Sequence, residues 1–198
     1  MQIVQYGHPV LSWKSKPIQT ITDELRSTVS AMFELMYAAK GIGLAANQVG
    51  LPYRLFVVNV TANPEEKGEE FVFLNPCIRR RKGSAEGEEG CLSLPSLYAK
   101  VARAEEIVVE AYDLEGEAFE MELDDLPARV VQHETDHLDG VLFVDRLSPE
   151  ERLKVEPKLL GFESEFRQRQ KLGEFPPDVE IKRRLRELEK GLRPRSPA

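Results

Sequence analysis

Two of the three histidines in the chain stand four residues apart in the stretch QHETDHLDG. Side chains four positions apart share one face of an α-helix, so His133 and His137 can bind one divalent metal ion together. Glu134 stands beside the first histidine, where a carboxylate can take a proton from metal-bound water. The alternative is a pair of core histidines satisfied by hydrogen bonds, but an HExxH arrangement is rare by chance and favours a metal site.

The third metal ligand decides which class of protein this is. In the extended metalloprotease signature, a glycine ends the helix and a third histidine follows three residues later. Gly140 is present, but Phe143 occupies the required position, and His8 is the only other histidine. A peptidase with a downstream glutamate as its third ligand stays open as an alternative, and its candidate ligands are Glu156, Glu163 and Glu165.

Cys91 offers a better third ligand. It lies in the stretch EEGCLSLP, where Gly90 permits close approach of a backbone and Pro95 is expected to end a short extended segment. One cysteine and two histidines leave a fourth coordination position for water or substrate, which is a catalytic arrangement. A closed structural site completed by Cys77 is the alternative. It is disfavoured because the two cysteines lack paired spacing and such a site has no need of a neighbouring glutamate.

The residues around the histidines predict the helix that presents them. The sequence DDLP offers an aspartate cap and a proline suited to the first turn, and Gly140 ends the pattern. Leu126 and Val130 precede the histidines at helical spacing, so both imidazoles are expected to point inward with these apolar residues. Glu134 lies about 100° around the helix from the first histidine, and partial burial is expected to raise its pKa.

The other segments predict a mixed fold. Apolar residues from Leu25 to Met36 follow helical spacing behind a threonine and aspartate start signal, which predicts an amphipathic helix. The charged stretches NPEEKGEE and RRRKGSAEGEEG are interpreted as exposed loops. We predict an α+β fold with antiparallel strands packed around a central metal-binding helix, an N-terminal helix and a C-terminal helical extension. The predicted strands span residues 53–60, 70–75, 105–113 and 117–123, with a DLEG turn between the last two.

Composition and charge exclude several classes of protein. The 198 residues can bury one substantial core, the first ten lack a signal-peptide pattern, and no apolar run approaches about 18 residues. A cytoplasmic protein with no membrane partner is therefore expected, in which the two cysteines form no disulfide. The net charge of -7 argues against a nucleic-acid surface over the whole molecule, and no specific DNA binding is expected.

Three stretches together resemble the signature motifs of the peptide deformylases, in the same order and at similar spacing: GIGLAANQVG (41–50), EEGCLSLP (88–95) and QHETDHLDG (132–140). The resemblance runs from about residue 3 to Leu147. It implies a hydrolase that releases formate from the N-terminal formylmethionine of newly synthesised bacterial or organellar proteins. It also implies one divalent metal ion per chain, Fe2+ in the cell, with Zn2+, Ni2+ or Co2+ able to replace it, whereas ligand type alone favours zinc.

By this resemblance, the residues at matching positions take over the family's roles: metal ligands Cys91, His133 and His137, general acid and base Glu134, and oxyanion donors Gln48 and the backbone N–H of Leu92. The chemistry agrees with these roles. An amide carbonyl needs an activated nucleophile such as metal-bound hydroxide, stabilisation of the charge on oxygen, and a proton for the departing amine.

Further residues are expected to bind the substrate. Ile42 and Gly43 would pair with an extended peptide as a short added strand, and Gly90 would permit its close approach. The methionine side chain needs an apolar pocket. The expected walls of that pocket are Ile42, Leu44, Leu92, Val130 and His133.

The sequence departs from the family pattern at two positions and in its tail. Ser12 stands where many members have arginine, and Tyr98 stands where some carry an arginine that faces the substrate peptide. Residues 1–147 are predicted to form the catalytic domain, and residues 148–198 a C-terminal helical extension. In that extension, Pro157 is expected to interrupt a first helix, and FPPD to link it to a second.

The extension ends in a basic amphipathic segment. Ile181, Leu185, Leu188 and Leu192 are spaced 4, 3 and 4 apart, and residues 181–198 carry seven basic and two acidic side chains, or +5. One interpretation is a helix that packs its leucines onto the catalytic core or a second subunit. The other is docking to the ribosome, whose RNA would attract the charge and bring the active site near nascent formyl-Met polypeptides.

Overall fold

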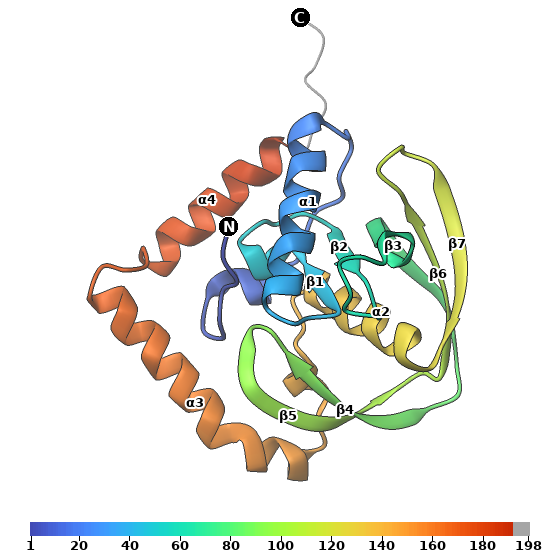
Figure 1. Cartoon of the computed structure of the whole chain (residues 1–198). Helices are drawn as coiled ribbons and strands as arrows, with labels where there is room; N and C mark the ends of the chain where they lie inside the picture. The colour runs from blue at the N-terminus through green and yellow to red at the C-terminus, as the bar shows by residue number, and fades with distance from the viewer. Residues whose placement is uncertain (192–198) are drawn as a thin grey trace, which may run out of the picture.

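The computed structural model describes residues 1–191, in which helices and antiparallel strands are mixed (Figure 1). The predicted α+β class is confirmed. The helices are α1 (Asp23–Ala38), α2 (Asp125–Leu138), α3 (Pro149–Lys171) and α4 (Asp178–Gly191), with short 3-10 helices η1 (Pro9–Ser12), η2 (Ala46–Val49), η3 (Lys67–Glu69) and η4 (Phe143–Arg146). The strands are β1 (Gly43–Ala45), β2 (Leu55–Val58), β3 (Phe71–Lys82), β4 (Ala85–Cys91), β5 (Leu94–Arg103), β6 (Glu106–Tyr112) and β7 (Ala118–Asp124).

The strands form two antiparallel sheets. Five of them pair in the order β1-β2-β3-β6-β7, and β4 pairs with β5 in a separate two-stranded sheet. The predicted DLEG turn is confirmed, because the N–H of Gly116 donates to the carbonyl of Asp113 between β6 and β7. Gly116 has a φ of 84°, a left-handed conformation that glycine adopts without a steric penalty.

The loop interpretation of RRRKGSAEGEEG is wrong. Strand β3 continues to Lys82 against β6, and β4 starts at Ala85. Opposite charges on neighbouring strands explain why so polar a sequence is extended: Arg79 pairs with Glu110 at 2.7 Å, and Lys82 with Glu106 at 2.9 Å. Such pairs join residues that are far apart in the sequence, so local composition does not indicate them. Pro95 likewise lies inside β5 and does not end the extended segment.

Helix α1 agrees with its sequence pattern. The side chain of Thr22 accepts a hydrogen bond from the N–H of Leu25 and so caps the first turn. The apolar face of α1 is buried against β1 and β2. Its members are Leu25, Val29, Met32, Phe33 and Met36.

Helix α2 occupies the centre of the molecule, between the larger sheet and the β4–β5 sheet (Figure 1). Every residue from Val130 to Leu138 is buried, which confirms a central helix. Leu126 was expected to point inward with the histidines, but its side chain is 48% exposed. It lies in the first turn, before the helix enters the core.

The C-terminal helices form an arc along one side of the molecule (Figure 1). Helix α3 continues through Pro157, so the expected interruption is wrong. The proline removes the hydrogen bond to the carbonyl of Leu153, and Leu153 lies on the exposed side of α3, where water can replace that bond. Residues 175–177 of the FPPD stretch link α3 to α4 as predicted, and its last residue, Asp178, begins α4. No helix within residues 1–191 is long and apolar enough to cross a membrane.

The extension packs onto the rest of the chain in one hydrophobic cluster. Val155 and Leu159 of α3 and Ile181 and Leu185 of α4 are buried in the same cluster as Val10. The interpretation that α4 packs its apolar face onto the core is therefore confirmed for these residues. Leu192, Arg193 and Arg195, which completed the basic pattern, lie outside the described residues.

Candidate active site

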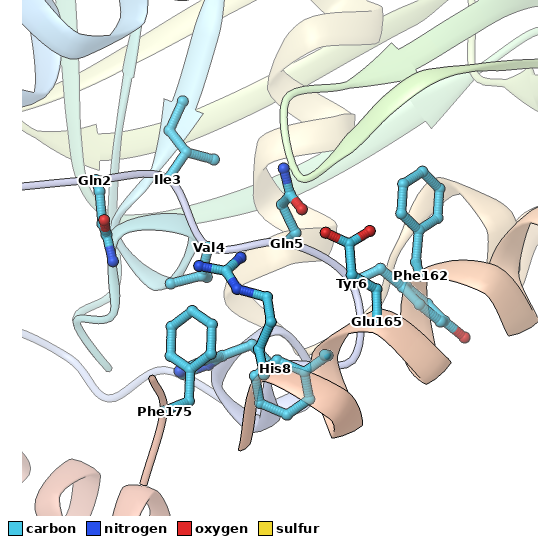
Figure 2. Close-up of a pocket in the computed structure, with 11 residues that line it drawn as sticks. Gln2, Ile3, Val4, Gln5, Tyr6, His8, Phe162, Glu165 and Phe175 are labelled. Carbon is cyan, nitrogen blue, oxygen red and sulfur yellow. The ribbon is translucent and has the colours of Figure 1, made fainter. Parts of the chain in front are cut away.

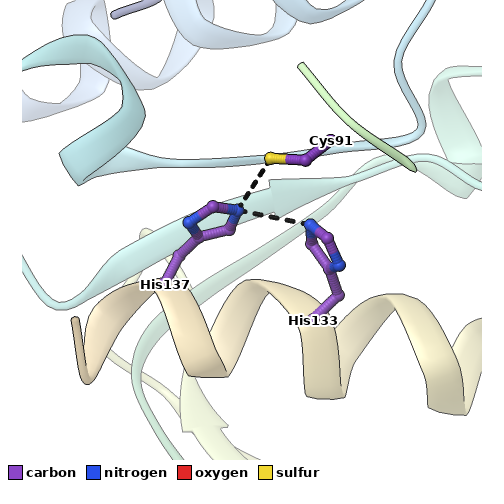
Figure 3. Close-up of side chains that lie close together, drawn as sticks. All are labelled: Cys91, His133 and His137. Atoms are coloured by element: carbon purple, nitrogen blue, oxygen red, sulfur yellow. Dashed lines mark hydrogen bonds between the residues drawn. The ribbon is translucent and has the colours of Figure 1, made fainter. Parts of the chain in front are cut away.

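Helix α2 and the end of β4 bring three candidate metal ligands together (Figure 3). Nε2 of His137 lies 3.2 Å from Nε2 of His133 and 3.3 Å from Sγ of Cys91. The one-turn spacing of the histidines places both rings on the same side of α2. Cys91 is the last residue of β4 and pairs with Leu94 at the turn into β5. This end of the β4–β5 sheet lies beside α2, so the thiol is close to both imidazoles.

The geometry of these three atoms fits a divalent cation. For metal–nitrogen bonds of about 2.0–2.1 Å and a metal–sulfur bond of about 2.3 Å, tetrahedral ligands lie about 3.3 Å apart for two nitrogens and 3.6 Å for nitrogen and sulfur. The observed separations of 3.2 and 3.3 Å are close to these values. Two imidazoles and one thiolate also leave a fourth position for water or substrate.

The other candidate ligands from the sequence lie elsewhere. Cys77 is a free, exposed residue on β3, so it does not close the site as a fourth ligand. His8 is half-buried near α3 and α4, where its ring contacts Phe166 and Phe175 at centroid distances of 5.5 and 5.9 Å. Figure 2 shows His8 beside a small pocket between the N-terminal segment, α3 and Phe175. The volume of this pocket is about 80 Å³. Burial lowers the pKa of His8 to about 4, so its ring is neutral.

Glu89 orients the first histidine, and sequence reasoning missed it. Its Oε2 lies 2.9 Å from Nδ1 of His133, which leaves Nε2 as the ligand nitrogen. Glu89 is buried, and it pairs with Arg103 at 2.9 Å and with Arg129 at 2.7 Å. Burial alone would raise the pKa of Glu89, but its hydrogen bonds with Arg103 and His133 hold that pKa well below its usual value. The carboxylate therefore stays ionised at neutral pH.

The same ion network includes a second carboxylate, on α2 itself. Arg103 also pairs with Asp136, which stands between the two histidines in the sequence. Asp136 in turn accepts two hydrogen bonds from Arg146, at 2.8 and 2.6 Å. Because breaking a buried ion pair leaves an uncompensated charge, this chain of contacts resists movement of α2 relative to β4 and β5.

Glu134 is buried next to the histidines, as its place in the helix predicts. Burial raises its pKa to about 7, and its Oε2 has no hydrogen-bond partner among the described residues. Gly43 of β1 allows this carboxyl group to fit. A Cβ atom at position 43 would lie only 2.6 Å from Oε1 of Glu134. A carboxyl group that titrates near neutral pH can both accept and donate a proton.

Gln48 is held with its amide nitrogen toward Cys91. Its Oε1 accepts a hydrogen bond of 2.8 Å from the N–H of Ala45, which fixes the carboxamide. Its Nε2 then lies 3.5 Å from Sγ of Cys91 and 3.3 Å from Oγ of Ser93. Ser93 is fully buried and was not expected from the sequence. The one feature of the sequence that could have indicated Ser93 is its position two residues after Cys91.

A cavity of about 730 Å³ opens onto these groups. Leu44 does not line it, since its side chain is fully buried beneath α1. Tyr98, Leu126 and Arg129 line the cavity although they were not expected among the substrate-binding residues, and Tyr98 is 64% exposed. The expected residues that line the cavity are Ile42, Gly43, Gln48, Gly90, Cys91, Leu92, Val130, His133 and Glu134.

Comparison with known proteins gives one consistent result. Residues 1–153 match the family described as polypeptide deformylase. The chain is 41% identical over 189 residues to a peptide deformylase of Rhodopirellula baltica, covering 96% of this chain and 94% of that protein. It is 51% identical over 148 residues to one of Acidobacterium capsulatum, covering 74% and 85%.

Solved structures agree with the sequence comparisons. The crystal structure of a plant peptide deformylase superposes with a TM-score of 0.83 at 40% identity, covering 87% of this chain and 93% of the other. The peptide deformylase of Thermus thermophilus superposes with a TM-score of 0.75 at 43% identity, covering 82% and 97%.

Proposed function

The chain belongs to the peptide deformylase family, and we propose that it removes the formyl group from N-terminal formylmethionine with Glu134 as the general acid and base. The products are formate and a free N-terminal amine. The observation that carries this assignment is the convergence of Cys91, His133 and His137 beside a buried carboxyl group that titrates near neutral pH.

We propose that these three side chains hold one divalent metal ion, Fe2+ in the cell, with Zn2+, Ni2+ or Co2+ able to replace it. A thiolate and two imidazoles suit all of these ions. When bound, the ion lowers the pKa of a water molecule so that it becomes a nucleophile toward the formyl carbon at neutral pH. The carboxylate of Glu89 supports this role by holding the Nδ1 proton of His133.

Glu134 moves the proton in the proposed reaction. As a carboxylate it accepts a proton from the attacking water, and as a carboxylic acid it gives that proton to the amine nitrogen that leaves. A group serves both steps best when its pKa lies near the working pH. The burial of Glu134 meets that requirement, since it raises the pKa to about 7.

Gln48 and the backbone N–H of Leu92 are proposed to stabilise the negative charge that develops on the formyl oxygen. The support for Gln48 is that its carboxamide is held in one orientation. Its oxygen accepts a hydrogen bond from the N–H of Ala45, and its nitrogen faces Cys91. A preorganised donor of this kind needs no reorientation during the reaction. Leu92 follows Cys91 directly and lines the same cavity.

The proposed substrate is an extended peptide that begins with formylmethionine, and the proposed partners are nascent polypeptides. Ile42, Gly43 and Gly90 border the cavity with backbone that a peptide can approach closely. Leu92 and Val130 offer apolar surface for the unbranched methionine side chain. Tyr98 extends the cavity's rim toward solvent, where residues after the methionine would lie.

We also propose a division of roles along the chain and a cytoplasmic location. Residues 1–147 contain all the proposed catalytic groups, and residues 148–198 form an extension. The burial of Ile181 and Leu185 supports a stabilising role for that extension. Docking of its exposed basic side to the ribosome stays a prediction.

An assay of formate release tests the proposed reaction. The chain, purified without oxygen, is incubated with formyl-Met-Ala-Ser, and the products are identified by mass spectrometry alongside metal analysis. We expect formate and Met-Ala-Ser, with Glu134→Gln as a matched inactive control. Cleavage of an internal peptide bond with the formyl group intact would contradict the assignment, and so would the absence of any product from the metal-loaded protein.

A further inference from the structure

The two histidines of the proposed metal site differ in what holds their second ring nitrogen. Nδ1 of His133 lies 2.9 Å from Glu89, whereas Nδ1 of His137 is buried and has no hydrogen-bond partner within residues 1–191. An imidazole whose Nε2 faces a cation carries its proton on Nδ1. Nδ1 of His137 is therefore a buried donor that needs an acceptor.

Asn47 carries an acceptor of the required kind. Its side chain is fully buried, and its Nδ2 donates a hydrogen bond to the backbone carbonyl of His137. The Oδ1 of the same carboxamide is buried and also has no partner in the described part of the chain. An unused acceptor and an unused donor thus belong to two residues that already share a hydrogen bond. In the described residues these two atoms are not hydrogen-bonded to each other, so a rotation of the carboxamide or of the His137 ring has to bring them into contact.

The 3-10 helix η2 holds Asn47 in this place. The N–H of Val4 donates to the carbonyl of Gln48 at 2.8 Å, and the N–H of Leu51 donates to the carbonyl of Ala46 at 3.0 Å. Gln48, the next residue, directs its amide nitrogen toward Cys91. Consecutive side chains of one short turn therefore contact two of the three residues proposed as metal ligands.

We propose that Asn47 is a positioning residue for His137: its Nδ2 holds the backbone of the ligand, and its Oδ1 accepts the Nδ1 proton when Nε2 binds the metal. This proposal rests on the metal site proposed above. Each ligand histidine then has an oxygen partner behind it, a carboxylate for His133 and a neutral amide for His137. The tautomer and ring orientation of His137 follow from that partner.

Metal affinity tests the proposal without reference to activity. The probe is Co2+, whose dissociation constant is measured by chelator competition and whose bond to Cys91 gives a thiolate charge-transfer band. Asn47→Leu keeps the size of the side chain and removes both polar atoms, and we expect it to weaken Co2+ binding roughly 10- to 100-fold.

Ser15→Ala is the matched control. The N–H of Ser15 donates to the carbonyl of Leu138 at 2.8 Å, at the same end of α2, and its hydroxyl is another buried oxygen that has no partner between residues 1 and 191. The substitution leaves that backbone hydrogen bond in place and removes no hydrogen bond to His137 from the described residues. Its Co2+ affinity should equal that of the unaltered chain, which separates a specific effect of Asn47 from general loosening of the helix end.

The outcomes are distinct. If folded Asn47→Leu binds Co2+ as tightly as the unaltered chain, Asn47 does not position His137. If the unaltered chain gives no thiolate band with Co2+, the metal site itself is wrong. NMR of the unaltered Zn2+-loaded chain gives a test without any variant: we expect a slowly exchanging Nδ1 proton on His137 with a nuclear Overhauser contact to Asn47, and its absence would overturn the proposal.

Discussion

A Cβ atom at position 43 would lie 2.6 Å from Oε1 of Glu134, so the absence of a side chain at Gly43 is what lets β1 pass beside the buried carboxyl group. Normal contacts between a carbon and an oxygen are longer than this, and an added methyl group would displace one of the two. The backbone of β1 is paired with β2 on one side. The carboxyl group is therefore the part that has to move.

Gly43→Ala should for this reason lower deformylase activity while the protein keeps its metal. We expect kcat/KM to fall by roughly 100-fold, the lower end of what a misplaced general acid and base costs. The measurement is steady-state kinetics on formyl-Met-Ala-Ser together with metal analysis. Gly68→Ala is the control, because a Cβ atom at Gly68 meets nothing within 4 Å. If Gly43→Ala had the kinetics of the unaltered chain, the added methyl group would not displace the Glu134 carboxyl group, and the prediction would be wrong.

The pKa of Glu134 gives a prediction about pH. Burial raises this pKa to about 7, and a nearby divalent cation favours the carboxylate and so lowers the value. The group accepts the proton only as a carboxylate, so kcat/KM should rise with pH and level off once the pH exceeds that pKa. We expect the midpoint of the rise at or below about pH 7.

Glu134→Gln should remove that rise. The amide keeps the size of the side chain but cannot accept the proton, so we expect activity to fall by about two to four orders of magnitude with the metal content unchanged. A pH profile of the residual activity completes the test. If this variant turned over substrate at nearly the normal rate, Glu134 would have no place in the mechanism.

The two cysteines should respond differently to replacement by serine. Cys91→Ser exchanges a thiolate ligand for an alcohol, a weaker and harder ligand, and should lose most of both metal and activity. Cys77→Ser changes an exposed side chain on β3 and should lose neither. Metal analysis by mass spectrometry after dialysis, with activity measured on the same samples, distinguishes them. An empty site in Cys77→Ser would contradict the three-ligand arrangement.

The sequence predicted those parts of the site that depend on local spacing. His133 and His137 are one helical turn apart, so an α-helix places their rings side by side, with the two Nε2 atoms 3.2 Å apart. Val130 and Glu134 follow from the same periodicity. Cys91 could be recognised because its motif is unusual, although nothing local places β4 beside α2.

The residues that support the site could not be predicted, because their partners are distant in the sequence. Glu89 stands in an acidic run that is typical of exposed loops, and it is buried only because Arg103 and Arg129 surround it. For Leu44 and Leu126, the sequence pattern led to the wrong expectation about which side of the molecule the side chain faces. An apolar residue near a motif was expected at the substrate, yet Leu44 is in the core beneath α1. Which apolar residues reach the cavity depends on the packing of whole elements.

The structure also changes how docking to the ribosome should be tested. Removing α4 would expose the cluster that buries Ile181 and Leu185, so a truncated chain that fails to bind could simply be misfolded. The basic side chains Arg183, Arg184 and Lys190 are exposed, however, and can be replaced without touching that cluster. From 181 to 191, five basic and two acidic residues leave a net charge of +3.

We therefore predict that the triple substitution of Arg183, Arg184 and Lys190 by glutamine weakens cosedimentation with ribosomes and leaves hydrolysis of formyl-Met-Ala-Ser unchanged. Each phosphate contact that is lost should reduce the slope of log affinity against log salt by roughly 0.7 to 0.9, because fewer counterions are released on binding. The unaltered chain should bind less as salt increases. Equal cosedimentation of both proteins, or none by either at low salt, would reject docking through the basic side of α4 and leave the extension with its packing role.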